Sequence, residues 1–359
     1  MKEFLKRKNI VFSLQRYGID AMSAMAQGLF CTLLVGTILN TLGSQFHIGF
    51  LTAEVFSAAG KGYTIGSVAS AMVGPAMAAA IGSALGASGL VLFSLIPVGY
   101  ATNFLGGAGG PFAVYIVAIV AAEAGKAVSK ETKVDILVTP IVTILVGIGL
   151  ASLIAAPVGK LAGWLGNLIM WSTEQLPFVM GILVSAIVGM ALTLPVSSAA
   201  ICAGLGLTGL AGGAAVAGCC AQMVGFAVMS FRENRWGGLV SQGIGTSMLQ
   251  MGNIIRNPRI WIAPILASMI TGPVATCIFH MQMNGAAVNS GMGTCGLCGP
   301  IGVWTGWSMD AASGIASAPT AFDWIGLVLV CFVLPAVLCW LFGELLRRIG
   351  WIRPGDLKL

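Results

Sequence analysis

The chain has 359 residues, of which 57% are hydrophobic and only 8% are charged, whereas a soluble globular protein carries about 25% charged residues. This composition excludes a water-soluble fold and predicts an all-α, polytopic membrane helical bundle, because the apolar residues suffice for about ten transmembrane helices of about 20 residues each. The formal net charge of +6 comes mostly from four basic clusters, so we expect no nucleic-acid partner.

Apolar runs that end at charges or at Gly/Pro clusters predict the membrane spans. The ten candidates are 20–43, 64–82, 86–106, 111–128, 135–157, 178–196, 198–213, 214–231, 260–281 and 322–346. Glycine and proline interrupt the spans 86–106 and 198–213, so either of them could be a re-entrant hairpin. Broken or re-entrant segments are therefore part of the predicted fold.

Three stretches are too polar or too irregular to be simple spans. Segments 44–62 and 158–177 are predicted to be amphipathic and to lie at the outer interface, where Trp164 and Trp171 suit the headgroup level. Segment 283–320 is rich in Gly, Asn and Ser. Non-helical backbone is tolerated at membrane depth only where protein buries it or where it lines a watery cavity.

The basic residues predict the orientation of the chain. Apart from Lys61 and Lys160, every Lys and Arg falls in one of four clusters, which are Lys2, Lys6, Arg7, Lys8 and Arg16; Lys126, Lys130 and Lys133; Arg232, Arg235, Arg256 and Arg259; and Arg347, Arg348, Arg353 and Lys358. Cytoplasmic loops collect Lys and Arg. With ten spans and the N-terminus inside, all four clusters and both termini are cytoplasmic.

The nine cysteines are scattered through apolar runs, where Cys behaves as a small hydrophobe. Cys295 and Cys298 have the CxxC spacing of metal and redox sites, but no second pair accompanies them, and the neighbouring Gly296, Gly299 and Pro300 predict a tight turn. We expect no metal and no cofactor. Phosphate-binding, zinc-protease and serine-hydrolase motifs are also missing from the sequence, so no catalytic site is visible.

An internal repeat is suggested by GLFCTLLVGTIL (28–39) and GILVSAIVGMAL (181–192). Five predicted spans separate the two, so they would run in opposite directions, as in transporters with inverted repeats. A second match, between TPIVTILVG (139–147) and APILASMITG (263–272), implies the same direction instead. The inverted repeat therefore stays one possibility, with halves at 1–177 and 178–359.

Polar residues inside a membrane are costly and are candidates for function. Asn284, Asn289, Thr294 and Asp310 share the Gly-rich stretch, where a broken helix would free backbone groups beside amides and a carboxylate. Such a set suits a polyhydroxylated ligand such as a sugar, and Trp304 and Trp307 offer faces for stacking. The alternative is an outer loop with ordinary turn chemistry.

Three further positions are candidates on weaker grounds. His280 and Gln282 follow the ninth span, where the histidine could relay protons, contact a ligand or simply lie at the interface. Asn103 precedes the Gly-rich run 106–110, which could unwind the third span opposite 283–320. The predicted substrate-binding set is Asn103, His280, Gln282, Asn284, Asn289, Thr294 and Asp310.

Glu123 is a candidate for coupling transport to an ion gradient, because it lies inside the fourth predicted span. Lys126 follows three residues later on the same helical face, so a local ion pair is the alternative interpretation.

Five stretches of the sequence resemble a known family. They are AAEAGKAVSKETKVDILVTPIVTILVG (121–147), LTLPVSSAAI (192–201), GGLVSQGIGTSMLQMGNIIRNPRIWIAPILAS (237–268), GMGTCGLCGPIG (291–302) and RRIGWIRPGDLKL (347–359). Together they resemble the EIIC-type membrane permeases of the bacterial phosphotransferase system, in the branch also labelled perfringolysin O regulator-like. The resemblance covers nearly the whole chain and implies a single EIIC membrane domain over 1–359.

Membership of that family would imply a sugar permease in the bacterial inner membrane, commonly a homodimer, that carries a carbohydrate inward and presents it to a phosphorylated IIB protein. Phosphoryl transfer in that system needs a Cys or His on soluble IIA and IIB domains. Neither the loop 232–259 nor the tail has room for such a domain, so separate proteins would supply them.

The leading hypothesis is a transporter of a small polar solute, most simply a sugar, with its site between the breaks at 103–110 and 283–310. The inner loops 126–135 and 232–259 would bind the IIB partner, because basic residues suit an acidic or phosphorylated surface. One alternative is a membrane-embedded regulator that senses a solute without transport. Another is an ion-coupled transporter of a non-sugar metabolite, for which Glu123, His280 and Asp310 are the candidate coupling groups.

Overall fold

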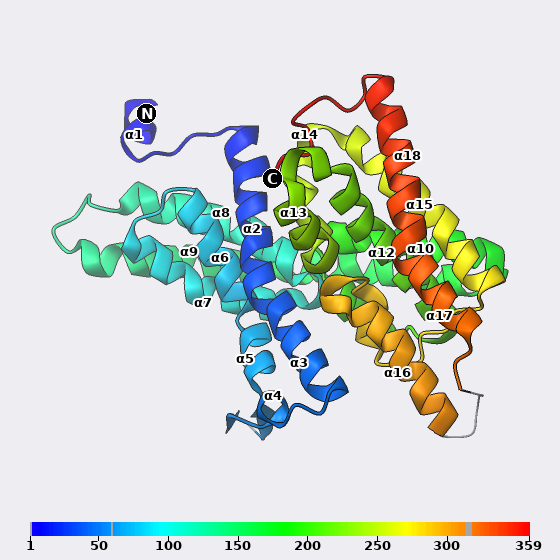
Figure 1. The fold of residues 1–359 in the computed structure, drawn as a ribbon. Helices are drawn as coiled ribbons and strands as arrows, with labels where there is room; N and C mark the ends of the chain where they lie inside the picture. The colour runs from blue at the N-terminus through cyan, green and yellow to red at the C-terminus, as the bar shows by residue number, and fades with distance from the viewer. Residues whose placement is uncertain (1, 59, 313–317) are drawn as a thin grey trace. The chain divides into compact units, whose positions relative to one another are not determined.

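The computed structural model describes residues 2–58, 60–312 and 318–359 of the chain. Apart from one short β-hairpin, the regular structure in these ranges is helical (Figure 1), which confirms the predicted all-α class. The chain forms two compact units, Met1–Ala162 and Gly163–Leu359. Helix α9 (Asp135–Thr173) runs from the first unit into the second.

The first unit begins with the short helix α1 (Lys2–Arg7) and a long apolar helix that starts at Gln15. Two π-helical turns occur in the long helix without breaking it, so that it consists of η1 (Gln15–Asp20), α2 (Ala21–Leu29), η2 (Phe30–Leu34) and α3 (Val35–Gln45). The Thr32 hydroxyl donates to the Gly28 carbonyl four residues earlier, at 2.8 Å, so a polar side chain in this apolar helix is satisfied locally.

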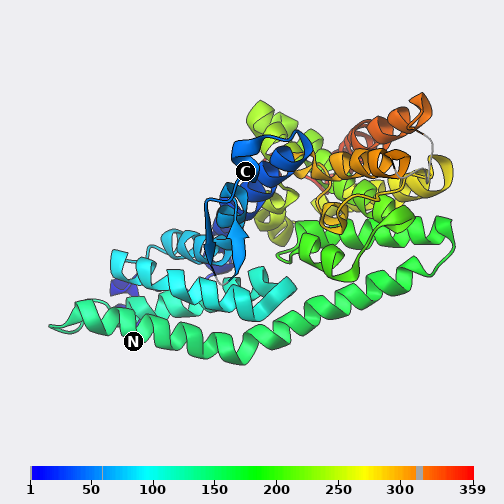
Figure 2. The same ribbon diagram turned by 90° about the horizontal axis from the view of Figure 1, so that it is seen from below.

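The segment 44–62, predicted to be an amphipathic surface segment, forms the one-turn helix α4 (Gly49–Thr52) and the antiparallel strands β1 (Phe56–Ala58) and β2 (Lys61–Tyr63) (Figure 2). Phe56 lies opposite Tyr63, and their rings stack with centroids 5.2 Å apart. Cross-strand aromatic pairs of this kind stabilise short hairpins.

A broken helix follows, consisting of α5 (Ile65–Ala71) and α6 (Val73–Ala84), which are bent by 52° relative to each other. The Thr64 side chain begins α5 by accepting a hydrogen bond from the backbone N–H of Ser67, which is the N-cap arrangement that satisfies a free donor at a helix start. The predicted span 64–82 is therefore two helical pieces.

Helices α7 (Gly89–Gly106) and α8 (Gly110–Val128) form a hairpin around the one-turn helix η3 (Gly107–Gly109). Gly107 has a φ of 52°, a conformation that glycine adopts without the steric cost a Cβ would bring. The predicted spans 86–106 and 111–128 are both confirmed as helices.

Helix α9 corrects the sequence prediction for 135–177. It is continuous through Pro140 and Pro157 and has 39 residues, so 158–177 is not a separate surface segment but largely the end of this helix. Proline and glycine are tolerated in membrane helices, where neighbouring groups satisfy the freed carbonyls. Trp164 and Trp171 lie on this last part of α9, and both are exposed.

The second unit is built around α12 (Gly209–Met229), the most buried of the membrane-length helices. Helices α10 (Pro177–Thr193), α15 (Ile262–Pro273) and α18 (Leu334–Arg348) pack around it. A Cβ on Gly218 of α12 would strike the Ser185 backbone of α10, and one on Gly272 of α15 would strike the Gly181 carbonyl. Small residues let membrane helices touch at the backbone, where dispersion replaces the missing hydrophobic driving force.

Shorter elements connect these helices. They are α11 (Ser198–Leu205), α13 (Phe231–Val240), η4 (Ser241–Gly245), η5 (Ser247–Gln250), α14 (Met251–Arg256), η6 (Pro258–Trp261), η7 (Val274–Ile278), η8 (Ala287–Gly291), η9 (Cys295–Leu297), α16 (Cys298–Ala312), α17 (Ala321–Val328) and η10 (Leu329–Val333).

Two sequence predictions in this unit need correction. The predicted span 198–213 is not a span, because α11 has eight residues and is about 12 Å long at 1.5 Å per residue; the chain then turns through Gly206 and Gly209, both with positive φ. The stretch 283–320 is not irregular throughout, since α16 occupies 298–312. Residues 313–317 of that stretch lie outside the described ranges.

The helix lengths identify the membrane-embedded part. Within the described ranges, six helical stretches are long and apolar enough to cross a membrane, or seven if the α5–α6 pair is one span. One of the six, Gly89–Val128, contains the turn at Gly107, and α10 is a shorter apolar helix of 17 residues. Large apolar side chains such as Leu145 and Leu153 of α9 are exposed, as expected for a surface that faces lipid.

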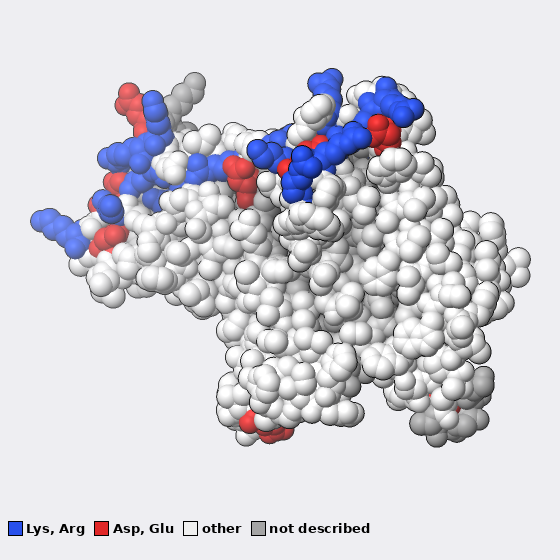
Figure 3. Space-filling view, in the orientation of Figure 1, with Lys and Arg blue, Asp and Glu red and all other residues white. Residues whose placement is uncertain are grey.

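Within each unit, an ion pair links two of the basic clusters, and the Lys and Arg side chains gather at one end of the unit (Figure 3). In the first unit, Arg7 of the first cluster pairs with Glu131, which lies between two lysines of the second cluster. In the second unit, Arg347 of the fourth cluster pairs with Glu233, which lies between two arginines of the third. Each unit therefore has one basic end.

Candidate functional site

The polar residues of the Gly-rich stretch meet at the end of α16. The Asn284 side-chain amide donates a hydrogen bond of 2.6 Å to Asp310 Oδ2 and one of 3.2 Å to Gln282 Oε1. Asp310 lies in the last turn of α16, where the helix dipole disfavours a negative charge. The Asp310 carboxylate therefore does not stabilise α16 through the helix dipole. The hydrogen bond from Asn284 partly offsets the unfavourable position of the charge.

Glycines allow the backbone around Asn284 to approach α16 closely. A Cβ on Gly306 would lie 3.0 Å from Asn284 Cα, and one on Gly285 would lie 2.5 Å from the Gly302 carbonyl oxygen. The extended segment beginning at Asn284 therefore lies directly against the face of α16 that carries Gly302, Gly306 and Asp310. These positions are four residues apart, so they follow one face of the helix.

Further along the stretch, Asn289 and Thr294 are buried. Among the described residues, the Thr294 hydroxyl has no hydrogen-bond partner, which is costly for a buried polar group. The Ser290 hydroxyl donates to the Leu207 carbonyl at 2.6 Å, and the Ser198 hydroxyl donates to the Gly291 carbonyl at 2.8 Å. The stretch is thus tied to α11 and to the loop after it.

The tryptophans expected to stack on a sugar lie on another face of α16. Trp307 meets Trp324 of α17 edge to face at 5.4 Å, and Trp304 lies 6.4 Å from the same ring. Trp307 also packs against the buried cluster around Val330. These indoles therefore join α16 to α17.

The structure places the remaining predicted site residues less centrally. His280 is exposed and has a positive φ of 45°. Asn103 belongs to the first unit, where its side-chain oxygen is 2.5 Å from the position of a Cβ on Gly110 at the start of α8. Of the seven predicted residues, the structure joins Gln282, Asn284 and Asp310 by hydrogen bonds.

Glu123 takes part in a buried ion cluster of the first unit. Its carboxylate is 2.8 Å from the Lys126 ammonium and 4.0 Å from the Arg16 guanidinium. Lys126 also donates to the backbone carbonyls of Asn9 and Leu85. This is the local ion pair that the spacing of Glu123 and Lys126 indicated, and the coupling role stays a prediction.

Sequence reasoning did not find a buried polar network that joins α10, α12 and α15. Gln222 of α12 accepts hydrogen bonds from Trp261 Nε1 at 2.8 Å and from the Thr193 hydroxyl at 3.3 Å, and donates to the Ser268 hydroxyl at 3.3 Å. Thr193 also bonds to Ser247. Serine and threonine are common in membrane helices, so only Gln222 carried a signal in the sequence.

A second network holds the C-terminal tail. Asn234 and Gln250 each donate to the Leu357 carbonyl, at 2.7 and 3.0 Å. Asn253 donates to the Lys358 carbonyl at 2.9 Å, and Asn257 to the Asp356 carboxylate at 2.8 Å. The amides of the GTSMLQMGNIIRNP motif thus bind the tail, which explains why both stretches have a distinctive sequence.

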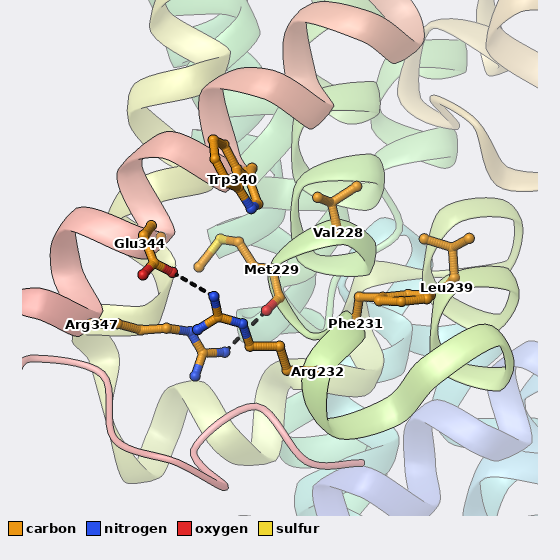
Figure 4. A pocket seen from close by; sticks show the side chains of 9 residues that line it. Val228, Met229, Phe231, Arg232, Leu239, Trp340, Glu344 and Arg347 are labelled. Carbon is orange, nitrogen blue, oxygen red and sulfur yellow. Dashed lines mark hydrogen bonds and ion pairs between the residues drawn. The ribbon is translucent and has the colours of Figure 1, made fainter.

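A pocket of about 230 Å³ lies at the basic end of the second unit, between α12, α13 and α18 (Figure 4). Arg232 crosses it to pair with Glu344 at 3.1 Å, and Arg347 donates to the Met229 carbonyl at 3.1 Å. Phe231 and Trp340 supply apolar walls. With its charges paired, this pocket has the chemistry of an amphipathic crevice rather than of a sugar site.

A family model described as the phosphotransferase system EIIC domain matches residues 19–359. The chain belongs to the phosphotransferase-system EIIC family. This EIIC protein is accordingly an integral membrane permease component, and its family implies a carbohydrate substrate and cooperation with IIB. No curated protein and no solved structure matches this EIIC chain.

Proposed function

We propose that this EIIC protein is the sugar-translocating permease of a phosphotransferase system and that Asn284 and Asp310 bind the sugar. The observation that carries the proposal is the 2.6 Å bond between them at the end of α16. The carboxylate can accept from sugar hydroxyls, and the amide can both donate and accept. A neutral polyhydroxylated solute needs such groups.

The surrounding residues support a binding role for this segment. Gln282 is exposed and already bonds to Asn284, so it can turn toward a solute. The buried, unpaired Thr294 hydroxyl belongs to the same stretch within the described ranges. We propose Asn289 and His280 as further contacts, because both are polar residues beside broken helices.

The partners follow from the family and from the charges. We propose that the basic ends of both units face the cytoplasm of a bacterial inner membrane, with both termini inside, as the positive-inside rule predicts. The loops 126–135 and 232–259 would then bind a separate IIB protein. A homodimer is the proposed assembly, as the resemblance to the family implies.

Uptake by the purified protein in liposomes tests this function. We expect a carbohydrate to enter vesicles that contain the wild-type protein. Variants Asn284→Ala and Asp310→Ala should lose at least tenfold in uptake while eluting from a sizing column as the wild type does. Unchanged uptake in both variants would overturn the assignment of the site. Binding of a solute without any uptake would favour a sensor instead.

A further inference from the structure

A pocket of about 400 Å³ opens at the basic end of the first unit. Three segments that are distant in sequence form it, namely the chain around Arg7 and Lys8, the turn around Ser88 that precedes α7, and the end of α8 with Lys126 and Lys130. Four cations line this pocket, and Glu131 is the carboxylate that lines it. None of the residues that line this pocket belongs to the proposed sugar-binding set.

Nearby carboxylates do not neutralise these cations completely. Glu131 pairs with Arg7 at 2.7 Å and with Lys8 at 2.5 Å, and Glu123 is shared between Lys126 and Arg16. Asp135 accepts hydrogen bonds from the Lys130 backbone N–H and the Thr139 hydroxyl. Counting Arg16 with the four cations that line the pocket gives five positive charges. The three carboxylates carry three negative charges, which leaves an excess of two positive charges.

Backbone carbonyls hold two of the cations in place. Lys8 donates to the Ser129 carbonyl and Lys126 to the Leu85 carbonyl at the end of α6. Their side chains are only 8% and 5% exposed. Cations in such poorly solvated positions are stabilised by an additional negative charge. Arg7 and Lys130, by contrast, are exposed, and Arg7 would have to share its guanidinium between Glu131 and a ligand.

Two hydroxyls complete the site. Ser88 stands at the N-cap of α7, and its hydroxyl is 3.3 Å from that of Ser129. Both side chains line the pocket.

We propose that this pocket binds a phosphate-bearing anion, either inorganic phosphate or the phosphate of an anionic lipid headgroup. Inorganic phosphate carries between about one and two negative charges near neutral pH and a phosphodiester headgroup carries one, so the excess positive charge attracts either of them. Arginine binds phosphate oxygens in a forked geometry, and hydroxyls donate to the remaining oxygens. The proposal requires neither a transported solute nor a partner protein.

The test compares Lys130→Gln and Arg7→Gln, both at exposed positions, with Lys133→Gln, which removes the same charge from the same loop outside the pocket. Each purified full-length protein is titrated with inorganic phosphate at constant ionic strength, with chloride as reference. Each is also reconstituted in phosphatidylcholine vesicles with and without phosphatidylglycerol, and native mass spectrometry counts the phosphatidylglycerol molecules retained.

We expect at least a tenfold loss of phosphate affinity, or loss of the retained phosphatidylglycerol, in Lys130→Gln and Arg7→Gln, with Lys133→Gln unchanged. Phosphate binding in detergent identifies the free anion as the ligand, and retention of phosphatidylglycerol alone identifies the headgroup. The proposal is overturned if neither ligand binds the wild type beyond the chloride reference. It is also overturned if Lys133→Gln weakens binding as much as Lys130→Gln does, because a general charge effect would then explain the result.

Discussion

The two units bury polar groups of different kinds. In Met1–Ala162, the cluster of Glu123, Lys126 and Arg16 is charged and lies at the basic end of the helices. In Gly163–Leu359, the network around Gln222 is neutral and joins α10, α12 and α15. An ion costs more than an amide in an apolar interior. An ionisable residue in an apolar run is therefore weak evidence of a transport site when an ion pair within the same unit explains its presence.

Breaking the charged cluster should have the largest effect on stability. Glu123→Gln leaves Lys126 and Arg16 buried without their counter-charge, so we expect the free energy of unfolding to fall by about 3–5 kcal/mol. Chemical unfolding in detergent measures the change. The matched control is Glu131→Gln, because Glu131 is 37% exposed where Glu123 is 12% exposed. Equal destabilisation by the two variants would contradict the contrast between buried and surface pairs.

Breaking the neutral network should cost less. Gln222→Met keeps the side-chain length but removes the acceptor of the Trp261 Nε1–H, while the Thr193 hydroxyl keeps its bond to Ser247. We expect a loss of about 1–2 kcal/mol, since hydrogen bonds between membrane helices are worth roughly this much. Gln175→Met is the control, because Gln175 follows the end of α9 and its side chain donates to the Trp171 carbonyl rather than joining two helices. If Gln222→Met lowered the free energy of unfolding as much as Glu123→Gln does, the buried charged cluster would not be more costly to break than the neutral network, and the comparison would be wrong.

The smallest effect concerns pH. The hydrogen bond from Lys8 is the main reason that the pKa of Glu131 is lowered. Because the folded state favours the ionised form, this stabilisation is complete above the ordinary glutamate pKa of about 4.3 and is lost as pH falls through the lowered value. We expect the melting temperature of the wild type to exceed that of Glu131→Gln slightly at pH 7, and the difference to vanish in acid. A difference that stays constant from pH 7 to pH 3 would rule out this origin.

The sequence predicts helices well where apolar runs are long, as in α8 and α12, because burial of apolar surface alone determines them. The prediction that a span ends at Pro157 is wrong. A proline normally ends a helix, but α9 continues through Pro157 to Thr173. The prediction also fails at 198–213, where high apolarity conceals a helix of only eight residues.

The candidate site was only partly predictable. The composition of the stretch pointed to Asn284 and Asp310, but their bond depends on the register of α16, which puts Gly302, Gly306 and Asp310 on one face. Without that helix in the prediction, Trp304 and Trp307 looked like members of the same site. The Gln222 network was missed because its serines and threonines resemble those of any membrane helix.

A thermal-shift screen of the detergent-purified protein tests the central claim most directly. Sugars, sugar alcohols and other small metabolites are screened on the wild type, on Asn284→Ala and on Ser308→Ala, which alters an exposed hydroxyl of the same helix. A ligand at one hundred times its dissociation constant stabilises the folded state by about 2.7 kcal/mol. We expect a carbohydrate to raise the melting temperature of the wild type and of Ser308→Ala but not of Asn284→Ala. Stabilisation by non-carbohydrates alone, or an undiminished shift in Asn284→Ala, would contradict the account.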